Sequence, residues 1–168
     1  TWLNNAITLR PYQFDGKDSI VFNGITSRVQ ALQNVSTATV WGLQTSVHYK
    51  IGRDLFIQSF ANWINGKETD DIRNEQVPLR HAAPFYGNTN LRYSRNKVFI
   101  EFTAMYNGEV SADELAPVEQ AKTDIYAKDG NGKPYSPSWY TINLRTSYQL
   151  NPKTSFTASW ENMTNQRY

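Results

Sequence analysis

The sequence has no cysteine and only two histidines, and its apolar residues are never gathered into a long run. The absence of cysteine excludes a disulfide-stapled scaffold and a thiol nucleophile. A membrane-spanning helix needs about 20 consecutive apolar residues, so that kind of anchor is excluded. Basic residues form no block: 17 Lys and Arg, against 15 Asp and Glu, are scattered along the chain. Without a basic stripe, no nucleic-acid partner is expected.

Aromatic residues, in contrast, are plentiful: they make up 14% of the chain and include five Trp and ten Tyr. The mean hydropathy is −0.61, which at first sight argues against a membrane protein. In a membrane β-barrel, however, only alternate residues meet lipid, so the average stays low. The chain starts at Thr1 without a visible signal peptide and stops at Tyr168 directly after a strand pattern. We therefore expect one part of a larger domain.

The clearest pattern lies between Tyr140 and Trp160. Apolar and polar residues alternate from Tyr140 to Leu150, and after a turn at Asn151–Lys153 the alternation resumes at Phe156. A period of two is that of a β-strand with one apolar and one polar face. Two such strands of roughly ten residues, joined by a tight turn, form a hairpin long enough to cross a bilayer at a tilt.

The same alternation predicts the remaining strands and their connections. Strands are expected at Trp2–Tyr12, Val29–Ile51, Leu55–Asn65, Phe85–Ser94 and Val98–Asn107. Further tight turns are expected at Gly52–Asp54 and Arg95–Lys97, and long loops at Gln13–Gly24, Gly66–Ala83 and Gly108–Ser138. In Leu55–Asn65 both faces carry apolar residues, so the orientation of that strand stays open.

Tight and long connections strictly alternate along the chain. In an up-and-down antiparallel sheet, all tight turns then lie at one end and all long loops at the other, as in an outer-membrane barrel. A soluble sandwich has no reason to sort its loops in this way. Aromatic residues at the two ends of the apolar face fit girdles at the lipid–water boundaries; they are Tyr49, Tyr93 and Tyr148 near the turns, and Phe85 and Tyr140 near the loops. The predicted fold class is all-β, an antiparallel up-and-down transmembrane β-barrel segment with about seven strands of a larger barrel.

Three segments resemble the C-terminal part of TonB-dependent outer-membrane receptors. Asn34–Gln44 is similar to the family's N-x-x-x-A-x-x-x-G-x-E strand, with Gln44 in place of the usual Glu. Val77–Gly87 resembles the proline-bearing start of a descending strand. Trp160–Tyr168 resembles the near-terminal E-N-L-x-(D/N)-x-x-Y signature. All three occur in order, on strands with the right phase, and the resemblance they carry extends over essentially the whole chain.

The resemblance implies that residues 1–168 are the C-terminal portion of a receptor barrel, a single partial domain. The plug, the TonB box and the closing strand of the family would lie outside this sequence. By the same resemblance, the whole protein takes up a scarce metal chelate (siderophore, haem or cobalamin) across the bacterial outer membrane, with TonB engaging the missing N-terminal region. Lipid surrounds such a barrel, binding involves no covalent chemistry, and neither enzymatic activity nor a cofactor is expected.

The alternation also assigns side chains to the two surfaces of the expected barrel. The residues expected to face lipid include Trp41, Leu43, Val47, Ile142 and Leu144. Those expected to line the lumen are Gln44, Arg92, Glu101, Asn143 and Arg145. His48 is expected in the lumen wall, as a polar wall residue rather than a metal ligand.

Candidate binding residues are few. In the ligand-facing loops, Arg80 and His81 could contact haem or a carboxylated chelate. The acidic cluster Glu68, Asp70 and Asp71 is interpreted as a solvated loop tip. No metal site and no catalytic residue are predicted.

The segment Asp129–Gly132 is similar to a calcium-binding loop in its D-G-N-G sequence. Lys133, however, stands where a third ligand would belong, so we expect a tight turn there instead.

Two alternatives stay open at this point. A soluble β-sandwich binding module would have its sheet faces buried or wet and would remain monomeric without detergent. An outer-membrane barrel hydrolase would need a serine and a histidine on the rim, and neither histidine has a serine at motif spacing.

Overall fold

The computed structural model describes residues 2–4, 7–34, 37–70, 74–80, 82, 85–122 and 124–167, and the strands in this part of the chain pair antiparallel throughout. The main sheet is built from β1 (Trp2–Asn4), β6 (Thr37–Ile51), β7 (Leu55–Asp70), β8 (Glu75–Pro78), β9 (Phe85–Arg95), β10 (Val98–Asn107), β13 (Trp139–Asn151) and β14 (Thr154–Trp160). The fold is therefore all-β, as the alternation predicted.

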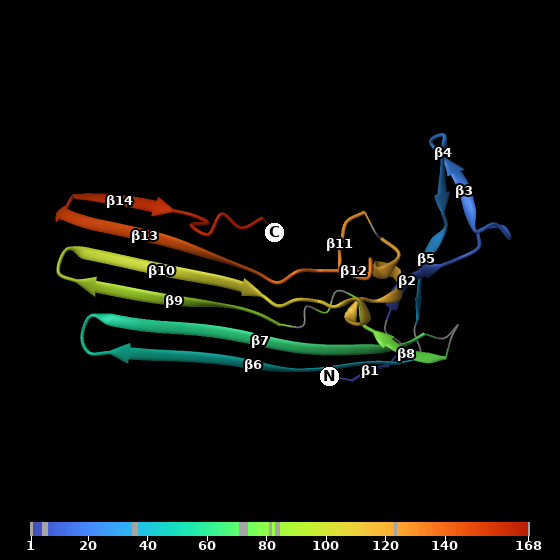
Figure 1. Cartoon of the computed structure of the whole chain (residues 1–168), viewed down its shortest axis with the longest axis horizontal. Coiled ribbons are helices and arrows are strands. Elements are labelled where there is room, and N and C mark those ends of the chain that lie inside the picture. The colour runs from blue at the N-terminus through green and yellow to red at the C-terminus, as the bar shows by residue number, and fades with distance from the viewer. Residues whose placement is uncertain are drawn as a thin grey trace.

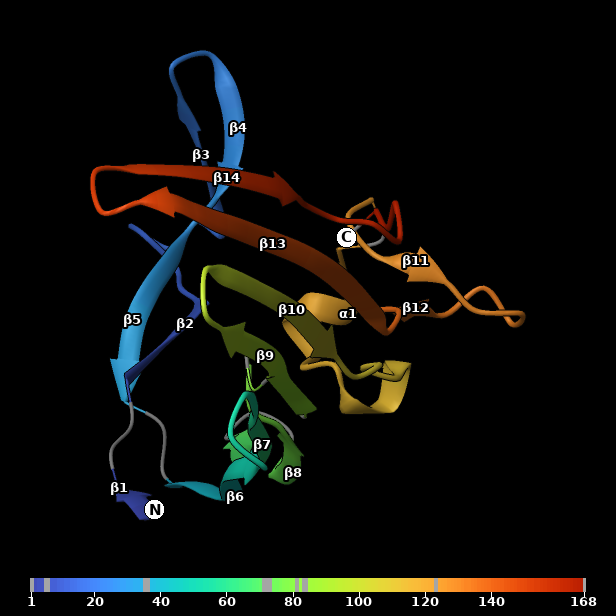
Figure 2. The same ribbon diagram turned by 90° about the vertical axis from the view of Figure 1, so that its left-hand side faces the viewer.

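The strands of the main sheet follow the order β1-β6-β7-β9-β10-β13-β14, with β8 beside the far end of β7. Three long hairpins, β6–β7, β9–β10 and β13–β14, run side by side with their tight turns at one end (Figure 1). We call this the turn end and the opposite end the loop end. Seen along β6 and β7, the strands β13 and β14 lie across the view, so the sheet is strongly twisted (Figure 2).

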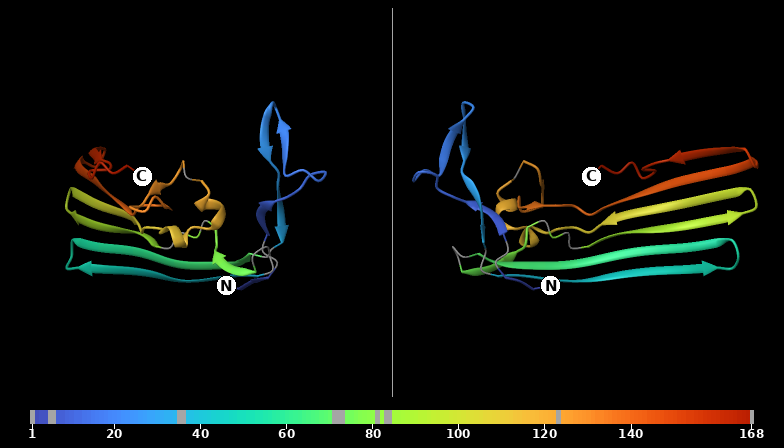
Figure 3. Two further views of the ribbon diagram at one scale, coloured as in Figure 1. Left: turned by 45° about the vertical axis from the view of Figure 1, so that its right-hand side comes forward. Right: turned by 180° about the vertical axis from the view of Figure 1, so that it is seen from behind.

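The remaining elements gather at the loop end. They are β2 (Ile7–Pro11), β3 (Ser19–Phe22), β4 (Ile25–Arg28), β5 (Gln30–Asn34), the 3-10 helix η1 (Ala112–Glu114), the single-turn helix α1 (Pro117–Gln120), β11 (Ala127–Lys128) and β12 (Pro134–Tyr135). The β3–β4 hairpin stands away from the main sheet (Figure 3).

Two expected strands are each divided in the structure. The segment expected at Trp2–Tyr12 forms β1, which pairs with β6, and β2, which pairs with β5 in a separate sheet. The segment expected at Val29–Ile51 forms β5 and β6. Alternation alone could not reveal these breaks, because it continues across them while the pairing partner changes.

Three expected loops contain regular structure. The first long loop holds the β3–β4 hairpin, whose turn is Asn23-Gly24 with φ of 50° and 79°. An Asn-Gly pair between apolar residues is a strong hairpin signal because both residues accept positive φ. The second is shortened because β7 extends to Asp70 and pairs there with β8. The third contains η1, α1 and the β11–β12 pair.

Register, rather than alternation, orients β7. Because directly paired residues share a face, Trp63 lies on the same side as its partners Leu43 and Phe85. Leu55, Ile57 and Trp63 therefore belong to the same face as the apolar residues of β6, and Phe56, Phe60 and Ile64 to the other.

The hairpins are staggered along the sheet in one direction. Leu55, the first residue after the first turn, lies opposite Tyr93. The second turn begins only two residues later, at Arg95. Val98, which follows the second turn, lies opposite Tyr148, three residues before Asn151, where the third turn begins. One of these three residues, Leu150, lies in a β-bulge. The stagger is thus about one residue per strand.

A glycine on β9 makes room for a tyrosine on β10. An added Cβ on Gly87 would lie 2.2 Å from the Phe60 carbonyl oxygen and 2.8 Å from the Tyr106 ring. The Tyr106 hydroxyl crosses this position and donates a hydrogen bond to the Phe60 carbonyl at 3.2 Å. The same ring stacks on Phe85 with 5.7 Å between centroids. This aromatic cover of a strand glycine ties three strands together near the loop end.

Candidate functional site

One face of the main sheet, which we call the apolar face, is covered with large hydrophobic side chains. By register its large members include Trp41, Leu43, Val47, Tyr49, Ile51, Leu55, Ile57, Trp63, Phe85, Leu91, Tyr93, Val98, Ile100, Phe102, Tyr106, Tyr140, Ile142, Leu144, Tyr148, Phe156 and Trp160. Charged or amide side chains that share this face within the described residues include Arg95 at a turn and Asn65, Lys67 and Gln76 at the loop end. The predicted grouping of Trp41, Leu43, Val47, Ile142 and Leu144 on one face is confirmed.

These apolar side chains are left open to the surroundings. Leu43 and Trp160 each retain 62% of their accessible surface, and Trp41 retains 51%. The buried hydrophobic residues of the described chain are Ala38, Val77, Leu115 and Ala116, none of which is among these large members. The described residues therefore place no second layer over the apolar face, and the residues that a sandwich core would need to bury stay exposed.

Aromatic rings concentrate toward both ends of the apolar face. Near the loop end, Trp41 and Trp63 meet edge to face with 5.2 Å between ring centroids. At the turn end, Tyr148 lies directly opposite Phe156, and Tyr93 lies opposite Leu55 beside the first turn. The aromatic residues that the sequence singled out lie at the expected ends of the face.

The opposite face, which we call the polar face, carries the amide, hydroxyl and charged side chains of the strands. Its members include Gln44, Ser46, His48, Lys50, Gln58, Asn62, Asn88, Asn90, Arg92, Glu101, Thr103, Asn143, Arg145 and Ser147. The residues predicted for a lumen, Gln44, Arg92, Glu101, Asn143 and Arg145, all lie on it. Large hydrophobic residues also lie on this face, among them Phe56, Phe60 and Ile64 of β7, Tyr86 of β9, Phe99 and Met105 of β10 and Trp139 of β13. The three residues on β7 explain why the orientation of that strand could not be predicted.

A charged row crosses the polar face. Arg92 donates two hydrogen bonds to Glu101 Oε2, at 2.9 Å from Nε and 2.7 Å from Nη2, and its guanidinium lies 5.7 Å from the centre of the Phe99 ring. Arg145 occupies the paired position on the other side of Glu101. Two arginines thus flank one carboxylate, which leaves this row with a net positive charge.

His48 lies on the polar face, as predicted. Its Nε2 is 3.1 Å from the Ser46 hydroxyl, and its ring meets Phe56 edge to face at 6.2 Å. A serine nucleophile also needs a third group to orient the imidazole. No carboxylate hydrogen bond to His48 is found among the described residues, so the pair is a strand-neighbour contact. The described residues also hold no group of three His, Asp or Glu side chains that could bind a metal ion.

The loops at the loop end fold together over the polar-face side of the sheet. Leu79 packs on Gly66, where an added Cβ would lie 2.9 Å from the Leu79 Cβ, and the Leu79 amide donates to the Gly66 carbonyl at 2.8 Å. Leu79 also lines a cavity with Asn107 and Leu115, so the segment after β8 meets the 108–138 segment there.

A buried carboxylate holds this loop cluster together. The Glu119 side chain is 5% exposed and accepts hydrogen bonds from Arg80 Nε at 2.5 Å, from Lys122 Nζ at 3.0 Å and from the Tyr126 hydroxyl at 2.9 Å. Burial raises the pKa of Glu119, but the bonds from Lys122, Tyr126 and Arg80 outweigh it and lower the pKa from 4.5 to about 2. Burial and the bond to Glu119 raise the pKa of Tyr126.

The structure describes some, but not all, of the residues that the sequence singled out in the loops. Arg80 lies in the loop cluster with its Nε bonded to Glu119, so part of its guanidinium serves the loop; its role toward a ligand stays a prediction. His81 lies outside the described residues, as does Asp71 of the acidic cluster. Glu68 and Asp70 belong to the end of β7 and pair with β8, so that segment is a strand end rather than a loop tip.

The D-G-N-G segment forms the expected tight turn. Asp129 Oδ1 accepts hydrogen bonds from the amides of Asn131 and Lys133, at 2.9 and 2.8 Å, and Gly132 takes a φ of 78°. The carboxylate is thereby engaged by its own backbone, as in an Asx turn.

Within the described residues, no helix is both long and apolar enough to cross a membrane. No protein-family model, no curated protein sequence and no solved structure matches this chain.

Proposed function

We propose that this chain forms part of the transmembrane β-barrel of a TonB-dependent outer-membrane receptor that imports a metal chelate. The observation that carries the proposal is the apolar face, which runs across six long strands and has no covering layer in the described structure. Exposed apolar patches on monomeric soluble proteins rarely exceed a few hundred Å². A lipid environment removes the free-energy cost of exposing this surface to water. Contact with lipid on one face also fits the alternation of apolar and polar residues.

The stagger of the hairpins supports a tilted, closing sheet. Strands lie about 4.8 Å apart and rise about 3.3 Å per residue. A stagger of about one residue per strand, with all turns in one plane, then corresponds to a strand tilt of about 35–40°. Transmembrane barrels have strands tilted by about 35–45°. The long strands also match this role: β6 has 15 residues and β7 has 16, more than a typical globular strand of about five or six.

The free edges of the sheet point to additional strands. In the described chain, β14 pairs with β13 alone, and β6 beyond Val40 pairs with β7 alone. Unpaired backbone groups cannot remain in hydrocarbon, because no solvent is present to satisfy them. A larger barrel supplies the missing neighbours, in agreement with the family resemblance.

In this proposal the turn end and the loop end of the sheet face different compartments. The turn end faces the periplasm and the loop end, with the cluster around Glu119, faces the outside, where a chelate such as a siderophore, haem or cobalamin first binds. The polar face lines the lumen, and TonB acts through a region outside this sequence. Import is a sequence of binding and conformational steps, so no bond-making residue is assigned.

The experiment uses the complete receptor that contains this sequence. The expected result is recovery in the outer-membrane fraction, with a folded form that migrates differently from the heat-denatured form on electrophoresis. A chelate panel then identifies the ligand by thermal stabilisation, since a ligand at 100 times its Kd adds about 2.7 kcal/mol. A detergent-free, monodisperse soluble protein would overturn the proposal and favour a binding module.

A further inference from the structure

The small net charge of the chain conceals a separation of charge. The hairpin segments 37–70, 85–107 and 139–160 hold eight Lys and Arg but four acidic residues, Asp54, Glu68, Asp70 and Glu101. The rest of the sequence holds the other nine basic and eleven acidic residues. The hairpins are therefore basic, and the loop-end segments are acidic.

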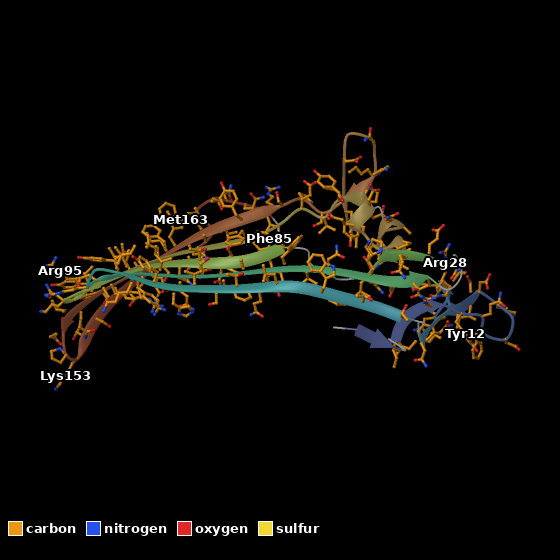
Figure 4. All side chains as sticks on the ribbon, turned by 90° about the horizontal axis from the view of Figure 1, so that it is seen from below. Tyr12, Arg28, Phe85, Arg95, Lys153 and Met163 are labelled. Carbon is orange, nitrogen blue, oxygen red and sulfur yellow. The ribbon has the colours of Figure 1, made fainter. Side chains whose placement is uncertain are left out.

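Much of this basic charge sits at the turn end. The three tight turns carry Arg53, Arg95, Lys97 and Lys153, with Asp54 as their acidic neighbour. Arg95 and Lys153 lie at one end of the molecule, far from Arg28 at the other (Figure 4). Four cations and one carboxylate give this end a net charge of about +3 at neutral pH.

The cationic side chains at the turns are only weakly engaged by other groups of the protein. Arg95 Nε lies 3.8 Å from Asp54 Oδ2, and the two side chains are 64% and 35% exposed. An exposed pair at this distance adds little stability and leaves the guanidinium accessible. Lys97 Nζ donates to the Leu150 carbonyl at 2.9 Å, which fixes its ammonium between the second and third hairpins.

Arg95 also lies on the apolar face, at its border. It is paired with Val98, and Val98 is paired with Tyr148. Between β10, β13 and β14 the face is hollowed by a shallow groove that Val98, Ile100, Tyr148 and Phe156 line. Val98, Tyr148 and Phe156 are 37%, 45% and 63% exposed. One lining residue of this groove, Val98, is paired with Arg95, so a cation stands next to the groove. An apolar groove beside a cation fits an amphiphile with an anionic head.

We infer that the turn end binds an anionic phospholipid, with its phosphate at Arg95 and Lys153 and an acyl chain along the groove at Tyr148 and Phe156. The inference rests on the proposed membrane barrel and adds a lipid preference to it. Basic clusters next to a membrane attract anionic headgroups over short distances, and amphipathic aromatic rings sit at the same depth. A free phosphate ion would meet the same cations but would not use the groove.

The test compares two charge-matched double variants of the complete receptor. Arg95→Gln/Lys153→Gln removes two turn cations, whereas Lys128→Gln/Lys133→Gln removes two exposed cations from the loop end. Each protein is inserted in bilayers of phosphatidylcholine and phosphatidylglycerol with matched acyl chains. Native mass spectrometry of the released protein then gives the ratio of bound phosphatidylglycerol to bound phosphatidylcholine, with inorganic phosphate added as a competitor.

We expect wild-type protein and the loop-end variant to prefer phosphatidylglycerol. The turn variant should lose about fivefold in that preference per cation removed, or about 30-fold for both. Arg95→Lys should retain most of the preference. Inorganic phosphate at millimolar concentration should leave the ratio unchanged, and displacement by it would overturn the lipid assignment.

Failure of this inference differs from failure of the proposed function. Normal insertion with equal lipid ratios in both double variants overturns the phospholipid site and leaves the barrel standing. Failure of the wild-type protein to insert into either bilayer overturns the barrel itself, and the phospholipid site with it.

Discussion

Replacing Leu144 with arginine probes the environment of the apolar face directly. Leu144 lies on β13 between its partners Phe102 and Trp160, four residues from Tyr140 and four from Tyr148. Four residues span about 13 Å along a strand, or about 10 Å of depth at a tilt of about 40°. In a bilayer, Leu144 therefore lies near the middle of an apolar band about 25 Å tall.

The expected cost follows from that depth. Arginine at the midplane of a membrane barrel costs about 2–4 kcal/mol. This lowers the equilibrium constant for folding by about 30- to 900-fold. In water, by contrast, arginine on an already exposed sheet face changes the free energy of unfolding by about 0.5 kcal/mol or less.

Two controls separate lipid exposure from charge alone. Arg145→Leu alters the neighbouring residue on the polar face and should change stability by less than about 0.5 kcal/mol. Ile25→Arg introduces the same charge at a 69% exposed residue of β4, outside the main sheet, and should also be nearly neutral. The assay is guanidinium unfolding of the complete protein in lipid vesicles, followed by tryptophan fluorescence. Equal stabilities for Leu144→Arg and Ile25→Arg would refute the reasoning.

Two further predictions concern the loop cluster and the strand glycine. Because the folded pKa of Glu119 is about 2 and its ordinary value is 4.5, its stabilisation is complete above about pH 4.5 and is lost as the pH falls toward 2. The protection of the amides of residues 108–122 against hydrogen exchange, taken relative to the intrinsic exchange rate at each pH, should therefore fall over that range in the wild type but not in Glu119→Gln, and a flat wild-type protection profile would contradict the role of the carboxylate. Gly87→Ala should destabilise the folded protein by about 1–3 kcal/mol because the new methyl group displaces Tyr106. Gly130→Ala, where nothing lies within 4 Å of the added Cβ, is the control, and equal unfolding midpoints would count against the close packing.

The period of two predicted the faces of most long strands because those strands separate apolar from polar residues cleanly. It failed for β7, whose polar face carries Phe56, Phe60 and Ile64. Those rings have local partners on that face: His48 meets Phe56, and Tyr86 lies 6.3 Å from Phe60. Only the register with β6 and β9 fixes the orientation, and register depends on contacts between distant parts of the chain.

The loop cluster could not be predicted for a related reason. Arg80 stands 39 residues before Glu119 in the sequence, and no local pattern joins them. The β3–β4 hairpin, in contrast, had its signal in Asn23-Gly24. Two residues determine the backbone geometry of this turn. The position of the buried carboxylate depends instead on how two long loops pack against each other.

The outermost long strands of the main sheet, β6 and β14, run in opposite directions, and this constrains any ring that includes them. β6 points toward the turn end and β14 points away from it (Figure 1). A neighbour added beside β14 must then point toward the turns, and the last one, beside β6, must point away. Only an even number of added strands, counting β1, meets both conditions without a parallel seam, so a closed ring of the proposed kind would have an even number of strands.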